Sequence, residues 1–254
     1  MKNLLREAKA VDINCAIGRA VDRKLKFESA DELASYLKKF HISRGVVTSL
    51  MATNWNLQDG NDWLFAQIAG HENLSPNVVL SPHLGTSELP PPEELHAWLK
   101  QHGVKSARLY PRSGAYQLDR FYAGALLELL NALRLPLLMD WGEIDPVSFP
   151  QVCADFPDIP FVLLGAGFLR SRLMYPLLEK RPNVFFEVSR FADYGILEEI
   201  VRKFGAGRLL FGSGMPSLNP GAAITWVCLA EIAEKEKLQI LGGNWRELEQ
   251  GVAS

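Results

Sequence analysis

The chain has 254 residues, of which 48% are hydrophobic and 22% charged, and its formal net charge is −2 at pH 7. This composition is that of an ordinary globular protein with enough apolar residues for a substantial core. The small negative charge argues against nucleic acid or an anionic membrane as the main partner. The length suits either two small domains or one large α/β barrel.

Cysteine spacing and the N-terminal segment indicate the cellular compartment. Cys15, Cys153 and Cys228 lie far apart and form no C-x-x-C pair, which favours a reducing environment. The first residues lack the apolar run and the cleavage site of a secretory signal. No run approaches the roughly 18 apolar residues of a membrane span. We therefore expect a cytoplasmic protein.

Short apolar runs bounded by turn residues recur along the chain and predict strands. Several of them show no alternation of polar and apolar residues, which is typical of parallel strands buried on both faces. The runs cover residues 10–17, 44–52, 77–84, 106–111, 136–142, 160–167, 183–189 and 208–214.

Amphipathic segments between these runs predict helices at 29–40, 91–103, 117–134 and 192–205. Ser29 with Glu32 three residues later is typical of a capping box at a helix N-terminus. Strands alternating with helices predict one (β/α)8 TIM barrel over residues 1–254. A doubly wound open sheet is the alternative fold, but no G-x-G-x-x-G motif follows the first run.

Barrel enzymes carry their functional side chains at the C-terminal ends of the strands. A lone Asp beside a lone Arg at such a position is more often a structural ion pair, and Cys15 could be a core residue. Glycines at 165, 167, 212 and 214 permit either tight turns or the close approach of a ligand. The polar residues expected at this end are Asn14, Cys15, Thr48, Ser49, Ser81, His83, Arg108, Tyr110, Asp140, Trp141, Glu143, Glu187, Ser189 and Arg190. Their convergence on one mouth indicates a binding site.

Taken in order, the strand ends resemble those of the amidohydrolase superfamily, in particular its smaller TIM-barrel hydrolases and decarboxylases. The matching stretches are "DINCAIG" (12–18), "ARLYPR" (107–112), "PLLMDWGE" (136–143), "VLLGAGF" (162–168), "LFGSGMP" (210–216) and "ILGGNWREL" (240–248). The last stretch and "LLFGS" are the most specific. The resemblance covers nearly the whole chain and implies a metallo-dependent-hydrolase-like TIM barrel.

The resemblance breaks at the positions where that family holds one or two divalent metals. The histidine pair of the first strand becomes Asn14 and Ala16, and the histidines of the fifth and sixth strands become Asp140 and Gly165. The aspartate of the eighth strand becomes Gly214. A catalytic zinc needs about three protein ligands and an open position. We therefore expect no metal and no cofactor. An aspartate at 214 would then be a buried carboxylate without a partner, which is costly.

Arg108 and Asp140 would be neighbours in the barrel, with both side chains pointing inward. We expect a guanidinium–carboxylate pair there that replaces the metal electrostatically, unless Asp140 faces a loop. We also expect Trp141 and the "GSGMP" loop to wall a pocket at the mouth, with His83 and Arg190 at its rim.

Three functions remain open at this point. In the first, a metal-independent hydrolase or lyase acts on a small polar or carboxylated molecule, with Arg108 binding an anionic group and Asp140 or Glu143 as general base. Such an enzyme should have a formed pocket and a carboxylate of raised pKa. The substrate-binding candidates are Asn14, His83, Tyr110, Trp141, Ser189, Arg190 and Ser213. In the second, an inactive pseudoenzyme barrel binds a metabolite or another subunit. The third and weakest is a metallohydrolase with unusual ligands such as Asp12, His83, Asp140 and Glu187.

Overall fold

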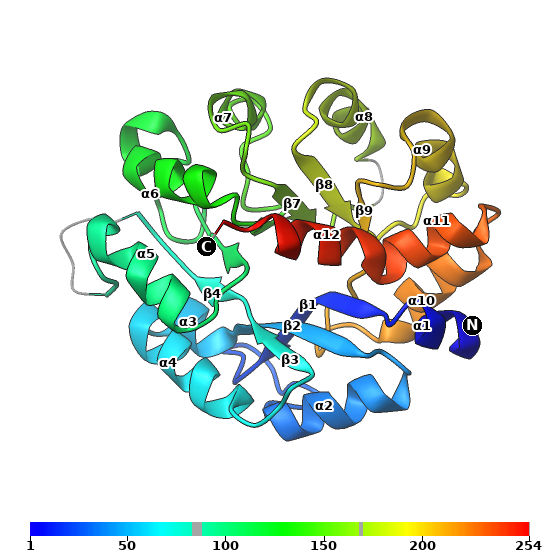
Figure 1. Cartoon of the computed structure of the whole chain (residues 1–254), viewed down its shortest axis with the longest axis horizontal. Helices are drawn as coiled ribbons and strands as arrows, with labels where there is room; N and C mark the ends of the chain where they lie inside the picture. Colours follow the sequence, from blue (N-terminus) through cyan, green and yellow to red (C-terminus); the bar gives the residue numbers. More distant parts are fainter. Residues whose placement is uncertain (83–87, 168–169, 254) are drawn as a thin grey trace.

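A computed structural model of the chain describes residues 1–82, 88–167 and 170–253. Parallel strands form a ring in its centre, and the helices surround this ring (Figure 1). The strands are β1 (Val11–Ile17), β2 (Arg44–Ser49), β3 (Leu74–Pro76), β4 (Val78–Val79), β5 (Ala107–Arg108), β6 (Leu137–Asp140), β7 (Phe161–Leu164), β8 (Val184–Glu187) and β9 (Leu209–Leu210). Each strand of the series β1–β2–β3 and β4 to β9 pairs in parallel with the next.

Backbone hydrogen bonds complete the ring between the two series. The Asn77 N–H, between β3 and β4, donates to the Val47 carbonyl at 2.8 Å, so β3 and β4 are two halves of one interrupted strand. The Ile13 N–H donates to the Phe211 carbonyl at 3.1 Å, which joins β1 to the segment after β9. Eight strand positions result, as predicted, and the fold is a (β/α)8 barrel.

Most regular strands are shorter than the predicted runs, and β5 and β9 have only two residues each. The third and second runs also differ in where they start or end. The third run starts earlier than predicted, at Leu74, and its regular pairing ends at Val79 instead of continuing to residue 84. The second run ends at Ser49 instead of residue 52 because the Ser49 side chain accepts hydrogen bonds from the N–H groups of Met51 and Ala52. Those bonds make Ser49 the N-cap of a short helix.

The helices fill the intervals between the strands, and all four predicted helices are present. Ser29 and Glu32 form the predicted capping box. The helices are α1 (Lys2–Glu7), α2 (Ala30–Lys39), α3 (Leu50–Asn54), α4 (Leu57–Ile68), α5 (Pro92–Gln101), α6 (Arg120–Leu133), α7 (Phe149–Asp155), α8 (Ser171–Lys180), α9 (Ile196–Phe204), α10 (Pro220–Leu229), α11 (Glu234–Leu238), the π-helical η1 (Gln239–Gly243) and α12 (Asn244–Gly251).

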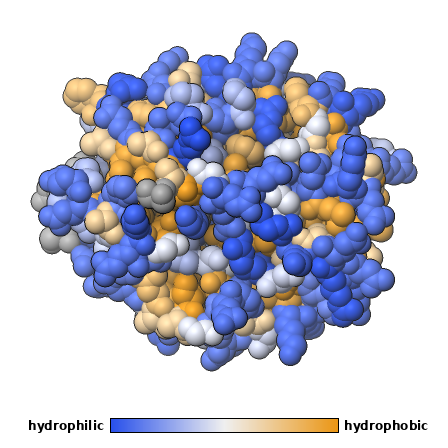
Figure 2. Space-filling model, viewed as in Figure 1, coloured by the Kyte–Doolittle hydropathy of each residue, from blue (hydrophilic) through white to orange (hydrophobic). Residues whose placement is uncertain are grey.

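The outer surface is largely polar. Figure 2 shows charged and polar residues over most of one face, with apolar residues in separate groups between them. Within the described ranges, no helix combines the length and the apolar character needed to cross a bilayer. The three cysteines are buried, free thiols.

The N-terminal end of the barrel is closed by α12, which crosses the middle of the ring in Figure 1. Trp245 of this helix is 1% exposed and belongs to the core inside the ring. The Asn244 side chain donates to the carbonyls of Ala206 and Leu209, both at 2.8 Å. These bonds fix the start of α12 to the start of β9. The other members of this inner core are Val11, Ile13, Val46, Leu138, Val162, Leu164 and Leu210. The buried charged side chains Asp12, Arg108 and Glu187 lie outside this apolar inner core.

Candidate functional site

The expected pair of Arg108 and Asp140 is present at the C-terminal ends of β5 and β6. One guanidinium nitrogen of Arg108, Nη2, lies 2.5 Å from Oδ2 of Asp140. The Arg108 side chain is 8% exposed, whereas that of Asp140 is 42% exposed. Burial alone would lower the pKa of Arg108, but Tyr110 and Asp140 raise it above its usual value, so the guanidinium stays charged. The site therefore contains a buried cation whose counterion faces solvent.

Asn14 on β1 connects this pair to a second carboxylate. Its side-chain oxygen accepts a hydrogen bond from Nη1 of Arg108 at 3.4 Å, and its amide donates to Oε2 of Glu187 at 3.4 Å. Glu187 ends β8 and also accepts from the hydroxyl of Ser189 at 2.8 Å. We call these five residues, Asn14, Arg108, Asp140, Glu187 and Ser189, the mouth network.

Glu187 is the acid of the mouth network whose pKa is changed by its surroundings. It is fully buried, and burial raises the pKa of its carboxyl to about 7. The N–H of Ser189, at 2.5 Å, and that of Gly165, at 3.2 Å, both donate to the carboxylate and limit this rise, whereas the charge of Asp12 adds to it. A group that titrates near neutral pH can both donate and accept a proton. The sequence placed Glu187 at this end of the barrel but did not single it out as an acid–base group.

Asp12 is a second buried carboxyl at the same end. Its Oδ1 accepts from the N–H groups of Asn14, at 3.0 Å, and Ser213, at 2.9 Å, while its Oδ2 has no hydrogen-bond partner in the described part of the chain. Burial raises the pKa of Asp12 as well. The hydroxyl of Ser213, a predicted ligand-binding group, accepts from the N–H of Met215 and so stabilises its own loop.

Two glycines, Gly165 and Gly214, follow β7 and β9 at the positions where the sequence resemblance predicts the family's metal ligands. Gly165 and Gly214 have φ angles of +66° and +72°, in the left-handed region that side chains rarely adopt. A Cβ on Gly165 would lie 3.5 Å from Cδ of Arg190, whose side chain covers this position. The positive φ angle of residue 214 therefore favours glycine. This backbone requirement adds to the expected cost of burying an aspartate there without a partner.

Three further predicted site residues lie around or outside the mouth network. The ring of Tyr110 lies 5.3 Å from the Arg108 guanidinium, and burial raises the pKa of its phenol. Glu143 instead accepts hydrogen bonds from the N–H and the hydroxyl of Ser113, at 2.9 and 2.5 Å, in the loop after β5. His83 lies outside the described residues.

The expectation that Trp141 walls a pocket at the mouth is wrong. Asp140 points inward to Arg108, and because successive strand residues face opposite sides, Trp141 points outward. It is 8% exposed and lines a cavity of about 180 Å³ between α7 and α8 together with Phe149 and Leu177. No residue of the "GSGMP" loop lines that cavity.

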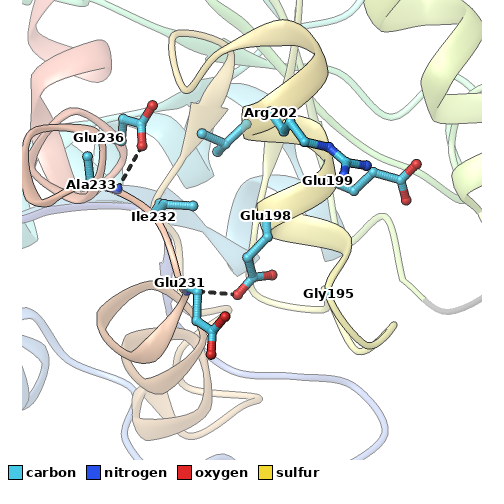
Figure 3. A pocket seen from close by; sticks show the side chains of 9 residues that line it. Gly195, Glu198, Glu199, Arg202, Glu231, Ile232, Ala233 and Glu236 are labelled. Atoms are coloured by element: carbon cyan, nitrogen blue, oxygen red, sulfur yellow. Dashed lines mark hydrogen bonds between the residues drawn. The ribbon is translucent and has the colours of Figure 1, made fainter.

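A cavity of about 800 Å³ lies between α9 and the segment leading into α11 (Figure 3). Four glutamates line it, but two of their carboxylates stabilise local backbone. Glu198 accepts from the Glu231 N–H at 3.0 Å, and Glu236 accepts from the Ala233 N–H at 2.8 Å. This cavity lies between helices, where no pocket was predicted, and none of its lining residues belongs to the mouth network.

The side chains of the mouth network do not fit a divalent metal. Nowhere in residues 1–82, 88–167 or 170–253 are three or more His, Cys, Asp or Glu side chains grouped to hold an ion. Within the mouth network, the amide and carboxylate oxygens that could coordinate a metal belong to Asn14, Asp140 and Glu187. The oxygens of Asn14 and Asp140 already accept hydrogen bonds from Arg108. A metal among them would be repelled by a buried guanidinium.

Solved structures with the same fold include several enzymes. A TIM-barrel protein of uncharacterised function from Bordetella bronchiseptica has a TM-score of 0.71 at 17% identity, covering 95% of this chain and 98% of that one. A dihydroxybenzoic acid decarboxylase from a Polaromonas species, with bound manganese and 2-nitroresorcinol, has a TM-score of 0.73 at 15% identity, covering 95% and 96%. A 5-carboxyvanillate decarboxylase from Sphingomonas paucimobilis has a TM-score of 0.72 at 11% identity, covering 98% and 100%.

At these identities the solved structures show a shared fold alone. No curated protein sequence matches the chain. The sequence model of one family, described as amidohydrolase (Amidohydro_2), matches residues 59–248. This match covers most of the barrel, from α4 to α12, and the chain therefore belongs to the amidohydrolase family.

Proposed function

We propose that this chain is a metal-independent lyase or hydrolase that acts on a small carboxylated molecule at the mouth network. The observation that carries the proposal is the continuous contact from Asp140 through Arg108 and Asn14 to Glu187, whose pKa of about 7 suits proton transfer at neutral pH. The solved structures of similar fold include decarboxylases named for 2,6-dihydroxybenzoate and 5-carboxyvanillate and a 4-oxalomesaconate hydratase, and these names support a carboxylated substrate.

The charges around the mouth support an anionic ligand. Arg190 is exposed above Gly165 and forms no ion pair with a described residue, so its guanidinium can bind a carboxylate in the bidentate manner that arginine favours. Asp140 is the exposed acid of the network, and its contact with Arg108 holds its carboxylate at the mouth. In this mechanism Asp140 acts as the base that removes or holds a proton at the substrate. Glu187, which accepts a hydrogen bond from the Asn14 amide, is the second group beside the mouth that can hold a proton near neutral pH.

A second function is favoured by a different observation. Glu187 is completely buried, four hydrogen bonds already satisfy its carboxylate, and the charge of Arg108 is balanced by Asp140. Such an arrangement also suits an inactive barrel that binds a small anion or another subunit, with the network only stabilising the mouth. Two properties separate these functions. The enzyme requires both a reactive Asp140 and ligand binding by Arg190, whereas the inactive barrel does not require a reactive Asp140.

The test uses protein treated with a chelator and a set of small aromatic and aliphatic carboxylates. Decarboxylation, hydration and hydrolysis are followed by product NMR, and binding is followed by calorimetry. We expect turnover without added metal, a loss of about 100-fold or more in Asp140→Asn, and a much smaller loss in Glu143→Gln, which removes the other candidate base. Binding that depends on Arg190 without any turnover would support the inactive barrel. Turnover that appears only after addition of a divalent metal would contradict both.

A further inference from the structure

A slot between α7 and α8 has the properties of a second ligand site. Its cavity of about 180 Å³ has an apolar floor formed by Trp141, Phe149 and Leu177, which are 8%, 2% and 6% exposed. The floor is supported from behind, because the Trp141 ring lies 6.2 Å from that of Phe186 and the Phe149 ring lies 5.5 Å from that of Phe161. A cavity with such a supported floor is formed before a ligand arrives.

The side walls of the slot offer almost no backbone donors. Pro146, Pro150 and Pro176 line them, and proline has no N–H group. The Pro150 carbonyl already accepts a hydrogen bond from Nε of Arg181 at 2.6 Å. A polar, uncharged ligand would therefore find few hydrogen-bond partners on these walls, whereas a flat ring could contact the prolines and aromatic rings on both faces.

One end of the slot is positively charged. Lys180 and Arg181, at the C-terminal end of α8, are both lining residues, and neither forms an ion pair with a carboxylate in the described chain. No acidic residue lines the slot. Arg181 uses Nε and Nη1 on backbone carbonyls, which fixes its guanidinium beside the floor. An anionic group would be bound here in a place where the apolar floor reduces screening by solvent.

We propose that the slot between α7 and α8 binds a small aromatic carboxylate, with its ring on Trp141 and Phe149 and its carboxylate at Lys180 and Arg181. The size of the cavity decides the class of ligand, because sites for drug-sized molecules measure about 300–1,000 Å³. The slot accommodates a single ring but neither a nucleotide nor a long acyl chain. It lies on the outer face of the barrel, so this site is additional to the mouth network, and no carboxylate lines it.

Benzoate is the probe, and the indole N–H resonance of Trp141, assigned with Trp141→Phe, is the readout in ¹⁵N-labelled protein. We expect a saturable shift of this resonance. Lys180→Glu should weaken benzoate about tenfold or more by placing a negative charge at the carboxylate end. Pro146→Trp, which fills the slot from an exposed position, should abolish the shift. Arg172→Glu, an equal charge change on the same helix outside the lining, should leave the affinity within about twofold.

Two control measurements separate binding in the slot from binding at the mouth and from nonspecific contact of an aromatic ring. Arg190→Ala removes the anion-binding group proposed for the mouth, and the Trp141 shift should survive it. Benzyl alcohol, which has the same ring without the charge, should bind much more weakly than benzoate. Unchanged affinity in Lys180→Glu, equal binding of benzyl alcohol, or loss of the shift in Arg190→Ala would each overturn the proposal. Self-association that disappears in Lys180→Glu would assign the slot to a second copy of the chain instead, which also overturns it.

Discussion

The two ends of the barrel are built on different principles. The N-terminal end is filled by apolar side chains and closed by Trp245. The closing helix α12 is held there by neutral hydrogen bonds of Asn244, by hydrogen bonds from Arg246 to the carbonyls of Ala8 and Lys9, and by a partly buried ion pair between Glu249 and Arg44. At the C-terminal end, a buried guanidinium and two buried carboxyls replace the apolar filling. The stretch "ILGGNWREL" at the first end resembles the family's terminal sequence, whereas the second end holds Asn14, Asp140, Gly165 and Gly214 at the positions where the resemblance predicts metal ligands. Apolar burial therefore stabilises the closed end, whereas paired and hydrogen-bonded charges occupy the open end.

The largest stability effect is expected at the closed end. Trp245→Ala removes the largest side chain of the inner core and leaves a cavity that α12 cannot fill. We expect a loss of about 3–5 kcal/mol in the free energy of unfolding. Trp226→Ala, at a residue that is 41% exposed on α10, is the matched control and should cost less than about 1 kcal/mol. Urea unfolding of both variants measures the difference. Similar losses would mean that α12 does not close the barrel.

The next effect concerns the charge pair at the open end. Asp140→Leu leaves Arg108 buried without its counterion and should cost about 3 kcal/mol. Arg108→Met leaves a carboxylate that is 42% exposed and can rehydrate, so it should cost only about 1 kcal/mol. The double change should recover much of the larger loss. A double-mutant cycle from thermal unfolding tests this order, and additive losses would show that the two charges do not stabilise each other.

A third effect is the dependence of stability on pH. The pKa of Glu187 rises from 4.5 to about 7 on folding, so the unfolded chain releases this proton first as the pH increases. Stability from this group is complete below about pH 4.5 and declines by up to about 3 kcal/mol as the pH passes 7. Asp12 acts in the same direction because burial also raises its pKa. The slope of unfolding free energy against pH between 4.5 and 7 is the measurement.

The control for this slope is a comparison of two neutral replacements. Glu187→Gln should flatten the decline whatever its absolute stability, because the titrating group is gone. Glu128→Gln, at an exposed residue of α6, should keep it. A decline that persists in Glu187→Gln would assign the pH dependence to other groups.

The sequence predicted the barrel and one of its internal contacts. Buried parallel strands show as short apolar runs, and Arg108 and Asp140 could be paired because adjacent strands bring inward-facing residues together. The same alternation directs Trp141 outward, away from the pocket wall where it was expected. The partner of Glu143 could not be predicted, since Ser113 lies in another loop that approaches only in the folded chain. The raised pKa of Glu187 depends on burial from several strands, which no local pattern records.

Our central proposal is that the buried guanidinium of Arg108 takes the place of the metal that the family resemblance implies. Calorimetric titration of the purified, chelator-treated protein with Mn²⁺ and Zn²⁺, combined with elemental analysis of the untreated protein, tests it most directly. The account predicts no stoichiometric metal after purification and no saturable binding, because Arg108 already donates to Asn14 and Asp140 and repels a second cation. About one equivalent of tightly bound metal per chain would contradict the account.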